Sequence, residues 1–397
     1  MVDLTRMINI DSLRVAAARN LPSMIFDFLE GGAEDEFTVR RNRVSFAEYS
    51  LVPRVLVDVG TIDMSVELLG RRIALPVMLS PTGASKTFHP GGELAAAKAA
   101  RAAKTFYSLS TMSNTSLEDV AKAADPKIFQ LYVFRDRGIT EELIRRAVES
   151  GYDALCLTVD MPVGGNRERD VRNRLALPYK PNLSGLMAIA RRPRWAANIL
   201  RTKFEMANFD FQTESRGRHG NMHFVNTQFD PGLTWSDLEW FVSKSGLPVM
   251  VKGILSAGDA VQAVNAGARA IMISNHGGRQ MDSVPAPLDV LAEIRDAVGS
   301  GPEIVLDGGV RRGTDVLKAL ARGANACSIG RPYVYGLAAA GEAGVARALQ
   351  ILQSELERGM KLMGLTKVSD IGAKDITCVS SWSWDTASRM HLRPRSA

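Results

Sequence analysis

Polar side chains and glycines follow each of eight short apolar runs in the sequence. Among them are His276, whose imidazole can act as a base near neutral pH, and Arg279, whose guanidinium can hold a carboxylate through two parallel hydrogen bonds. If the runs are the strands of one barrel, all these residues lie at one rim, where barrel active sites are built. In chain order they are Pro81, Thr82 and Gly83; Ser110; Gln130 and Tyr132; Thr158 and Asp160; Lys252; Ser274, Asn275, His276 and Arg279; Asp307, Gly308, Gly309 and Arg311; and Gly330 and Arg331.

The last two of these loops indicate a phosphate site. Gly309 and Arg311 follow the seventh run, and Gly330 and Arg331 follow the eighth. Glycine loops expose backbone N–H groups and arginines add cations, at the position where this type of barrel commonly binds phosphate. The alternative is that the glycines only form tight turns and the arginines are solvated.

The eight runs have the spacing of strands in a parallel sheet. Longer Ala-rich helical patterns follow them, such as Gly92–Lys104 and Thr140–Ser150, which is typical of βαβ units. No G-x-G-x-x-G or Walker sequence is present, so a closed (β/α)8 TIM barrel is favoured over an open doubly wound sheet. The runs are Pro76–Ser80, Thr105–Leu109, Ile128–Tyr132, Ala154–Val159, Pro248–Lys252, Ala270–Ser274, Ile304–Asp307 and Ala326–Ile329.

The 397 residues are expected to form one domain, since such barrels reach more than about 400 residues. Residues 1–72 predict a helical lead-in with a short strand or two, and 73–340 predict the barrel. The interval after the fourth strand is far longer than the others, which indicates an insertion at 175–230. Residues 341–379 predict a C-terminal helix, centred on Ala343–Gly364, and 380–397 a polar tail.

Composition is that of a globular protein, with 46% apolar and 23% charged residues. The three cysteines lie far apart and have no metal-ligand spacing, which predicts a reduced, cytoplasmic location and no metal site. Charges interrupt the first twenty residues, which predicts an amphipathic helix instead of a signal peptide. No window has the length of apolar sequence that a membrane-spanning helix needs.

Positive charge is concentrated in the insertion. Between Pro178 and Phe229 there are eight Lys or Arg and three acids, a net charge of 8 − 3 = +5 out of +6 for the whole chain. Leucines and aromatic residues are interleaved with these cations, as in segments that lie on an anionic bilayer surface. Residues 180–220 are therefore expected to contact a membrane, with a solvated active-site lid as the alternative. Nucleic-acid binding is not expected, because no known binding fold is present.

The whole pattern resembles the family of FMN-dependent L-2-hydroxy-acid oxidases and dehydrogenases, which includes glycolate oxidase, flavin lactate dehydrogenases and mandelate dehydrogenase. Its most specific stretch is Ser274-Asn275-His276-Gly277-Gly278-Arg279-Gln280. It is supported by Asp307-Gly308-Gly309-Val310-Arg311-Arg312-Gly313 and, near the N-terminus, by Gly31-Gly32-Ala33-Glu34-Asp35-Glu36. The similarity extends over nearly the whole chain.

This resemblance implies roles for five residues in the oxidation of a substrate. His276 would accept a proton, and Asp160 would hydrogen-bond the imidazole and favour its charged form. Arg279 would bind the substrate carboxylate, with Arg167 as a second arginine nearby. Tyr132 would contact a substrate oxygen. Ordinary packing, or a surface ion pair, is the alternative for each of these side chains.

The resemblance also implies a complete FMN site. Lys252 would lie beside the N1 and O2 edge of the flavin, where a cation stabilises the reduced form. Backbone groups of Pro81, Thr82 and Gly83 would face N5. The remaining cofactor residues would be Ser110, Gln130, Thr158, Ser274, Asp307, Gly309, Arg311, Gly330 and Arg331.

Three positions depart from the family pattern. Phe28 stands where most members have a tyrosine that donates to the substrate carboxylate, a loss worth about 1 to 3 kcal/mol. Met112 and Gly164 stand where glycolate oxidase has a tryptophan and a leucine. Together they predict a roomier pocket, suited to lactate or to a larger or aromatic acid such as mandelate.

The electron acceptor is expected to be external, because no haem domain or C-x-x-C-H motif is present. We expect a quinone, reached from the inner face of the plasma membrane, and the resemblance implies a homotetramer. One alternative is an oxidase that uses O2. Two others belong to different classes: a phosphate-binding lyase that forms a Schiff base through Lys252, and a flavin-binding protein without turnover.

Overall fold

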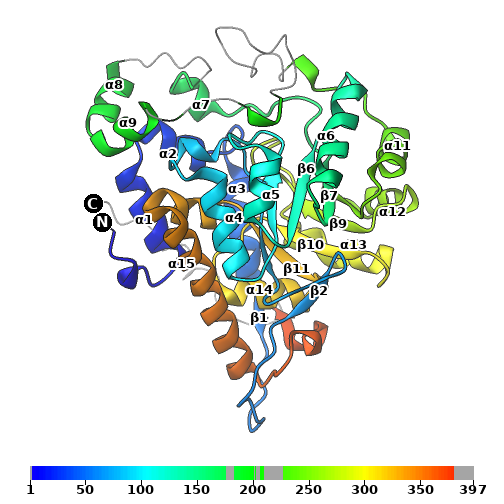
Figure 1. Cartoon of the computed structure of the whole chain (residues 1–397). Helices are drawn as coiled ribbons and strands as arrows, with labels where there is room; N and C mark the ends of the chain where they lie inside the picture. The colour runs from blue at the N-terminus through cyan, green and yellow to red at the C-terminus, as the bar shows by residue number, and fades with distance from the viewer. Residues whose placement is uncertain (1, 176–182, 201, 203–205, 210–226, 380–397) are drawn as a thin grey trace.

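Eight parallel strands close into a barrel in the computed structural model, which describes residues 2–175, 183–200, 202, 206–209 and 227–379 (Figure 1). Each strand pairs with its neighbours in the chain, and β11 pairs with β4 to close the ring. The predicted (β/α)8 fold and all eight predicted strands are confirmed. The strands are β4 (Val77–Leu79), β5 (Tyr107–Ser110), β6 (Lys127–Leu131), β7 (Ala154–Thr158), β8 (Val249–Ile254), β9 (Ala270–Ser274), β10 (Glu303–Asp307) and β11 (Ala326–Ile329).

Eight helices, one after each strand, cover the outside of the barrel. Short polar side chains begin several of them: Ser116 caps α5 and Ser256 caps α12 by accepting a backbone N–H three residues on. The helices are α4 (Gly92–Ala102), α5 (Leu117–Ala123), α6 (Arg137–Glu149), α11 (Trp235–Ser245), α12 (Ala257–Asn265), α13 (Pro287–Val298), α14 (Gly313–Ala321) and α15 (Arg331–Met363).

Side-chain alternation along the strands decides which residues face the barrel axis. Alternate residues of each strand fall into two separate apolar clusters, one against the outer helices and one inside the ring. Ile128, Cys156, Met250 and Met272 belong to the inner cluster. Two residues further along these four strands come Gln130, Thr158, Lys252 and Ser274, which therefore also face inward and form a polar layer above an apolar plug.

The lead-in supplies helices on one side of the barrel mouth and a plug at the opposite end. Leu68 and Ile73, from a two-stranded hairpin, are buried in the inner cluster and close the barrel at the N-terminal ends of its strands. The helices are α1 (Ile10–Asn20), α2 (Ser23–Glu30) and α3 (Phe37–Val44); the short strands are β1 (Tyr49–Leu51), which pairs with β12 (Ile376–Cys378), and β2 (Val66–Leu68) with β3 (Arg71–Ile73).

The insertion and the tail are described only in part. Helices α7 (Glu168–Arg172), α8 (Leu183–Ala190) and α9 (Pro193–Leu200) belong to the segment between β7 and β8. Figure 1 shows α8 and α9 at the upper left, at the same end of the molecule as α7. Residues 176–182, most of 201–226 and the predicted polar tail 380–397 lie outside the described residues.

The last helix, α15, is kinked, and Gly336 and Gly344 allow its two segments to pack closely against each other. The backbone is non-helical at Ala340 and Gly341, so α15 consists of two helical segments, the second beginning close to the predicted start at Ala343. Across this kink a Cβ on Gly344 would lie 1.9 Å from the carbonyl oxygen of Gly336. Since α15 packs against both α1 and α4, this close approach fixes the position of two neighbouring helices.

Replacing Gly344 by alanine is therefore expected to lower the melting temperature. The added methyl overlaps backbone atoms, and overpacking typically costs about 1 to 3 kcal/mol. Gly258→Ala in α12 is the matched control, because a Cβ there meets nothing within 4 Å and alanine favours helix by about 0.5 to 1 kcal/mol. Thermal unfolding of both variants checks this, and equal melting temperatures would contradict the packing argument.

Candidate active site

A base, a carboxylate and an ammonium group meet at the C-terminal ends of the strands. His276 Nδ1 lies 2.9 Å from Asp160 Oδ1, and Lys252 Nζ lies 3.7 Å from Asp160 Oδ2. Asp160 and His276 each follow a strand by two residues, β7 and β9, and Lys252 lies within β8, so the barrel itself sets their separation. When Nδ1 donates its proton to Asp160, Nε2 of a neutral imidazole is left as the acceptor.

The surroundings keep His276 neutral and Asp160 ionised near neutral pH. Burial lowers the pKa of His276, and Lys252 lowers it further, while Asp160 opposes both. Burial alone would raise the pKa of Asp160, but Lys252 and His276 lower it to about 2. The pair therefore holds a base beside a permanent negative charge, which stabilises the imidazolium after the base has taken a proton.

A chain of hydrogen bonds ties the His276 loop to two other strands. The His276 N–H donates to Ser274 Oγ (3.0 Å), and the Ser274 hydroxyl donates to Asp307 Oδ2 (2.8 Å). Ser80 donates to the other oxygen of Asp307 (3.0 Å). Ser274 and Asp307, predicted to bind the cofactor, thus also fix the loop that carries the base.

Arginines converge beside this pair. The guanidinium of Arg279 lies over the ring of Phe28 at 5.1 Å, and one of its nitrogens donates to the carbonyls of Phe28 (2.8 Å) and Gly31 (2.9 Å). Burial, followed by the charges of Arg167 and Arg331, lowers the pKa of Arg279 to about 9. Such a cluster of cations favours an anionic ligand.

The charge of Arg167 acts on Arg279, but its side chain is paired with Asp170. Its Nε forms an ion pair with Asp170 at 2.8 Å, and the positive charge of Arg279 also acts on Asp170. Its predicted approach to the substrate carboxylate stays a prediction.

Tyr132 stands in an aromatic cluster at the rim. Its ring packs edge-on against Phe229 at 5.1 Å and tilted against Phe134 at 6.3 Å. Burial, followed by the charge of Asp160, raises the pKa of Tyr132, so the hydroxyl stays protonated and available as a donor. Tyr132 and Thr158 also line a cavity of about 190 Å³ whose other walls include Val159, Met161, Pro162, Phe229 and Leu233.

Buried polar atoms that lack a hydrogen-bond partner test whether FMN fits. Lys252 Nζ and Thr158 Oγ1 are buried in the polar layer, and neither has a hydrogen bond within the part of the chain that is described. Such atoms are rare unless a ligand or water satisfies them. Their donor chemistry suits the carbonyl and imide edge of a flavin. Ser110 and Gln130, by contrast, already bond to each other at 3.2 Å.

The predicted phosphate residues divide into two groups. Gly330 begins α15 without a side-chain cap, which leaves a helix N-terminus free to bind an anion, and Arg311 Nε has no partner in the described structure. Arg331 instead donates to the carbonyls of Leu29, Gly31 and Gly277 at 2.8 to 3.0 Å.

Steric contacts explain two of the other glycines. A Cβ on Gly309 would lie 1.8 Å from the carbonyl of Asn42, so this position is glycine because a lead-in helix packs there. A Cβ on Gly83 would lie 2.9 Å from the carbonyl oxygen of Met112. Thr82 contacts Tyr333 through a hydroxyl–hydroxyl hydrogen bond. Gly164 is exposed and nothing lies within 4 Å of an added Cβ, so the roomier pocket stays a prediction.

Gln280 lies within the specific motif, but the sequence alone predicted no role for it. Its side-chain amide donates to the carbonyls of Asp160 (3.2 Å) and Val163 (3.0 Å) and accepts from the Gly165 N–H (3.2 Å). It therefore joins the loop of the base to the loop of the carboxylate.

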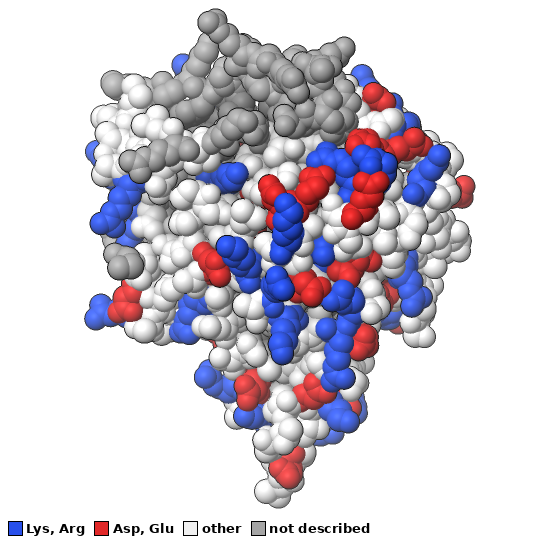
Figure 2. All heavy atoms as spheres, viewed as in Figure 1, with Lys and Arg blue, Asp and Glu red and all other residues white. Residues whose placement is uncertain are grey.

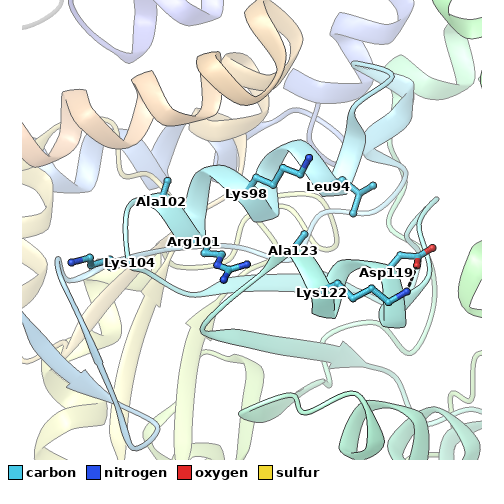
Figure 3. A pocket seen from close by; sticks show the side chains of 8 residues that line it. All are labelled: Leu94, Lys98, Arg101, Ala102, Lys104, Asp119, Lys122 and Ala123. Atoms are coloured by element: carbon cyan, nitrogen blue, oxygen red, sulfur yellow. Dashed lines mark hydrogen bonds and ion pairs between the residues drawn. The ribbon is translucent and has the colours of Figure 1, made fainter.

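Charge on the outer surface is mixed, and a hollow on that surface is remote from this chemistry. Figure 2 shows Lys and Arg interspersed with Asp and Glu over the face that it displays. A hollow of about 680 Å³ lies between α4 and α5 (Figure 3), lined by Lys98, Arg101, Lys104 and Lys122 among others. No strand-end residue lines it, so it is not part of the site.

A closed barrel with a half-buried base, a carboxylate partner and clustered arginines at its mouth defines an enzyme that acts on an anionic substrate. Within the described residues, no cluster of three or more His, Cys, Asp or Glu could hold a metal ion, and no helix is long and apolar enough to cross a membrane.

Comparison with known proteins identifies the class further. Residues 17–378 match the family model described as FMN-dependent dehydrogenase. The chain is 44% identical over 376 residues to an L-lactate oxidase of Nostoc, covering 94% of this chain and 98% of the relative. It is 42% identical to a peroxisomal (S)-2-hydroxyacid oxidase of Arabidopsis thaliana, covering 93% and 96%. A crystal structure of the monotopic membrane protein (S)-mandelate dehydrogenase superposes with a TM-score of 0.91 at 36% identity, covering 94% and 100%.

The chain therefore belongs to the FMN-dependent dehydrogenase family, with FMN as its cofactor, and it is an oxidoreductase. The family resemblance drawn from the motifs is confirmed. The Schiff-base lyase alternative for Lys252 is excluded by the same result.

Asp160→Asn should shift the acid limb of the kcat/KM profile to lower pH. The carboxylate raises the pKa of His276, so its loss lets burial and Lys252 lower that pKa further. The base works unprotonated, and activity then survives to lower pH. The plateau value of kcat/KM should fall about tenfold for each pKa unit by which His276 becomes a weaker base. Steady-state profiles test this, with the surface variant Asp119→Asn as control; an unmoved limb at full rate would refute it.

Proposed function

We propose that the chain oxidises an L-2-hydroxy acid to the 2-oxo acid. The observation that carries this proposal is the 2.9 Å contact between His276 and Asp160 beside a cluster of half-buried arginines. Arg279, assisted by Arg167, binds the substrate carboxylate, and Tyr132 donates to a substrate oxygen. His276 takes one proton and Asp160 stabilises the imidazolium. FMN, when bound, would accept the two electrons and the second hydrogen that the substrate loses.

Residues around the flavin divide the remaining work. Lys252 stabilises negative charge at the flavin edge, while Thr158, Ser110, Gln130, Ser274 and Asp307 fix its orientation. Backbone groups of Pro81, Thr82 and Gly83 face it, and Gly309, Arg311, Gly330 and Arg331 surround its phosphate. Lys252 Nζ and Thr158 Oγ1, which have no hydrogen-bond partner among the described residues, support this assignment.

Lactate, or a larger or aromatic acid such as mandelate, is the substrate that we propose. Gly164 leaves open space, and the cavity beside Tyr132 has apolar walls such as Val159, Met161 and Phe229 as well as polar ones. Its volume of about 190 Å³ exceeds the roughly 150 Å³ of an apolar cavity that accepts benzene. Phe28 contributes ring contact with Arg279 in place of a hydroxyl.

The acceptor that we propose is external, a quinone, with O2 as the second candidate. The relatives named above include oxidases as well as a dehydrogenase, so the family alone does not decide between them. Anaerobic reduction followed by separate addition of O2 and a short-chain quinone distinguishes the two by rate.

Anaerobic mixing with L- and D-forms of lactate, mandelate, glycolate and 2-hydroxyoctanoate tests the proposal. The L-forms should bleach the flavin, with glycolate not preferred. His276→Gln should bleach about 10²–10⁴-fold more slowly, the usual effect of losing a general base. His89→Gln is the matched control, because the half-buried His89 packs on Gly341 and accepts from the Gly91 N–H, away from Asp160. A flavin that stays oxidised with every acid would instead indicate a flavin-binding protein without turnover.

We also propose that the enzyme is peripheral on the inner face of the plasma membrane and forms a homotetramer. Helices α8 and α9 expose Leu186 (52%), Met187 (49%) and Leu200 (86%). Helix α9 is attached to the body of the protein, since Trp195 donates to the Thr87 carbonyl at 2.9 Å. The similar (S)-mandelate dehydrogenase is a monotopic membrane protein, which supports this placement.

Flotation with phosphatidylglycerol-containing vesicles tests the membrane surface. Leu186→Asp/Met187→Asp/Leu200→Asp should reduce the vesicle-bound fraction at least about tenfold, because burying each apolar side chain contributes about 1.5 to 3 kcal/mol. Val148→Asp/Val261→Asp/Leu362→Asp, at exposed apolar positions on α6, α12 and α15, should float like the native protein. Equal flotation of all three proteins, or none, would remove the membrane claim.

A further inference from the structure

The loop that carries His276 has an unusual backbone conformation. His276 has a φ of +55°, and Gly277 and Gly278 follow at +63° and +73°. A left-handed conformation is unfavourable for a residue with a side chain and persists only where its surroundings impose it. Something outside this loop must therefore stabilise it.

Asn275 is the first element that stabilises the loop. Its side-chain oxygen accepts from the Gly278 N–H at 3.0 Å, which closes the turn around His276. Its side-chain nitrogen donates to the Pro285 carbonyl at 3.1 Å. Asn275 is itself buried, so its orientation depends on its other partners.

Asn42, in helix α3 of the lead-in, supplies those partners. Its Nδ2 donates to Asn275 Oδ1 at 2.9 Å, and Asn275 Nδ2 donates to Asn42 Oδ1 at 2.7 Å. Both side chains are at most 4% exposed. A buried, reciprocal amide pair leaves no freedom to flip, because a flip would oppose two oxygens and two N–H groups.

The position of Asn42 is itself well determined. Helix α3 has no side-chain cap of its own; Asp282, from the same loop as His276, accepts from the N–H groups of Phe37 (3.0 Å) and Thr38 (2.7 Å). The Ala33 N–H donates to the Gly278 carbonyl at 2.8 Å. The lead-in and the catalytic loop thus hold each other at several points.

We propose that Asn42 is a positioning residue for His276: through Asn275 it holds the loop in the left-handed conformation that directs the imidazole to Asp160. Asn42 touches neither the base nor the reacting atoms. Its effect on turnover rests on the function proposed above, whereas its effect on the loop does not.

Rapid-reaction kinetics of the FMN-loaded enzyme test the catalytic part. Asn42→Ala should slow anaerobic flavin reduction about 10- to 100-fold, the range expected when a reacting group is misplaced by about 1 Å, while the substrate concentration for half-maximal rate changes little. Combining it with Asn275→Ala should add almost nothing to Asn275→Ala alone, because both act through one pair. Asn20→Ala, which removes an amide bonded to the Ala338 and Ala339 carbonyls in α15, should reduce flavin at the native rate.

Hydrogen exchange provides the measurement that does not depend on activity. Amides of residues 275–282 should exchange faster in Asn42→Ala and remain protected in Asn20→Ala. Asn42→Asp, which keeps the shape but removes the donor to Asn275, should act in the same direction and serves if the alanine variant does not fold. Native protection of this loop in both Asn42 variants, or additive kinetic losses with Asn275→Ala, would overturn the proposal. Failure of every hydroxy acid to reduce the native protein would refute the proposed function and leave the exchange test intact.

Discussion

Asp160 pairs with both Lys252 and His276 at the mouth of the barrel, and much of the site depends on this shared carboxylate. Arg279 and Arg331 lie nearby, half-buried, and donate to backbone carbonyls. Unpaired buried charge is costly, so this arrangement is most stable when anionic groups occupy the mouth. A cofactor phosphate and a substrate carboxylate are such groups, which links the electrostatics of the protein directly to its ligands.

The lead-in lowers the free-energy cost of placing Arg279 and Arg331 at the barrel mouth. Arg279 and Arg331 donate to carbonyls of Phe28, Leu29 and Gly31, at the C-terminal end of α2. The carbonyl end of a helix carries partial negative charge, so it stabilises nearby cations. A segment outside the barrel therefore orients two arginines of the site. This close packing requires a glycine at position 32, because a Cβ on Gly32 would lie 2.7 Å from the Gly278 carbonyl oxygen.

Local patterns in the sequence predicted the strands and the strand-end residues, because alternation and β-branched content are properties of neighbouring residues. The same patterns gave no sign of contacts between distant segments. Asn42 and Asn275 are 233 positions apart, and the cap of α3 comes from 244 positions away. Glu36 occupies the N-cap position of α3 in a left-handed conformation and makes no capping hydrogen bond. Its residue type therefore does not reveal that the cap comes from Asp282. The motif predicted Arg331 as a phosphate ligand, but its three carbonyl partners appear only in the folded chain.

Residues that differ within the family matter through their neighbours as well as through their own size. Gly83 is expected at the flavin and Met112 at the substrate, yet the two loops touch: the Ala84 N–H donates to the Met112 carbonyl at 2.8 Å, and any Cβ on Gly83 would approach the same oxygen. A larger residue at position 83 would therefore displace the loop that carries Met112. Because of that contact, a change at the position predicted to face the flavin also alters the position predicted to line the substrate pocket.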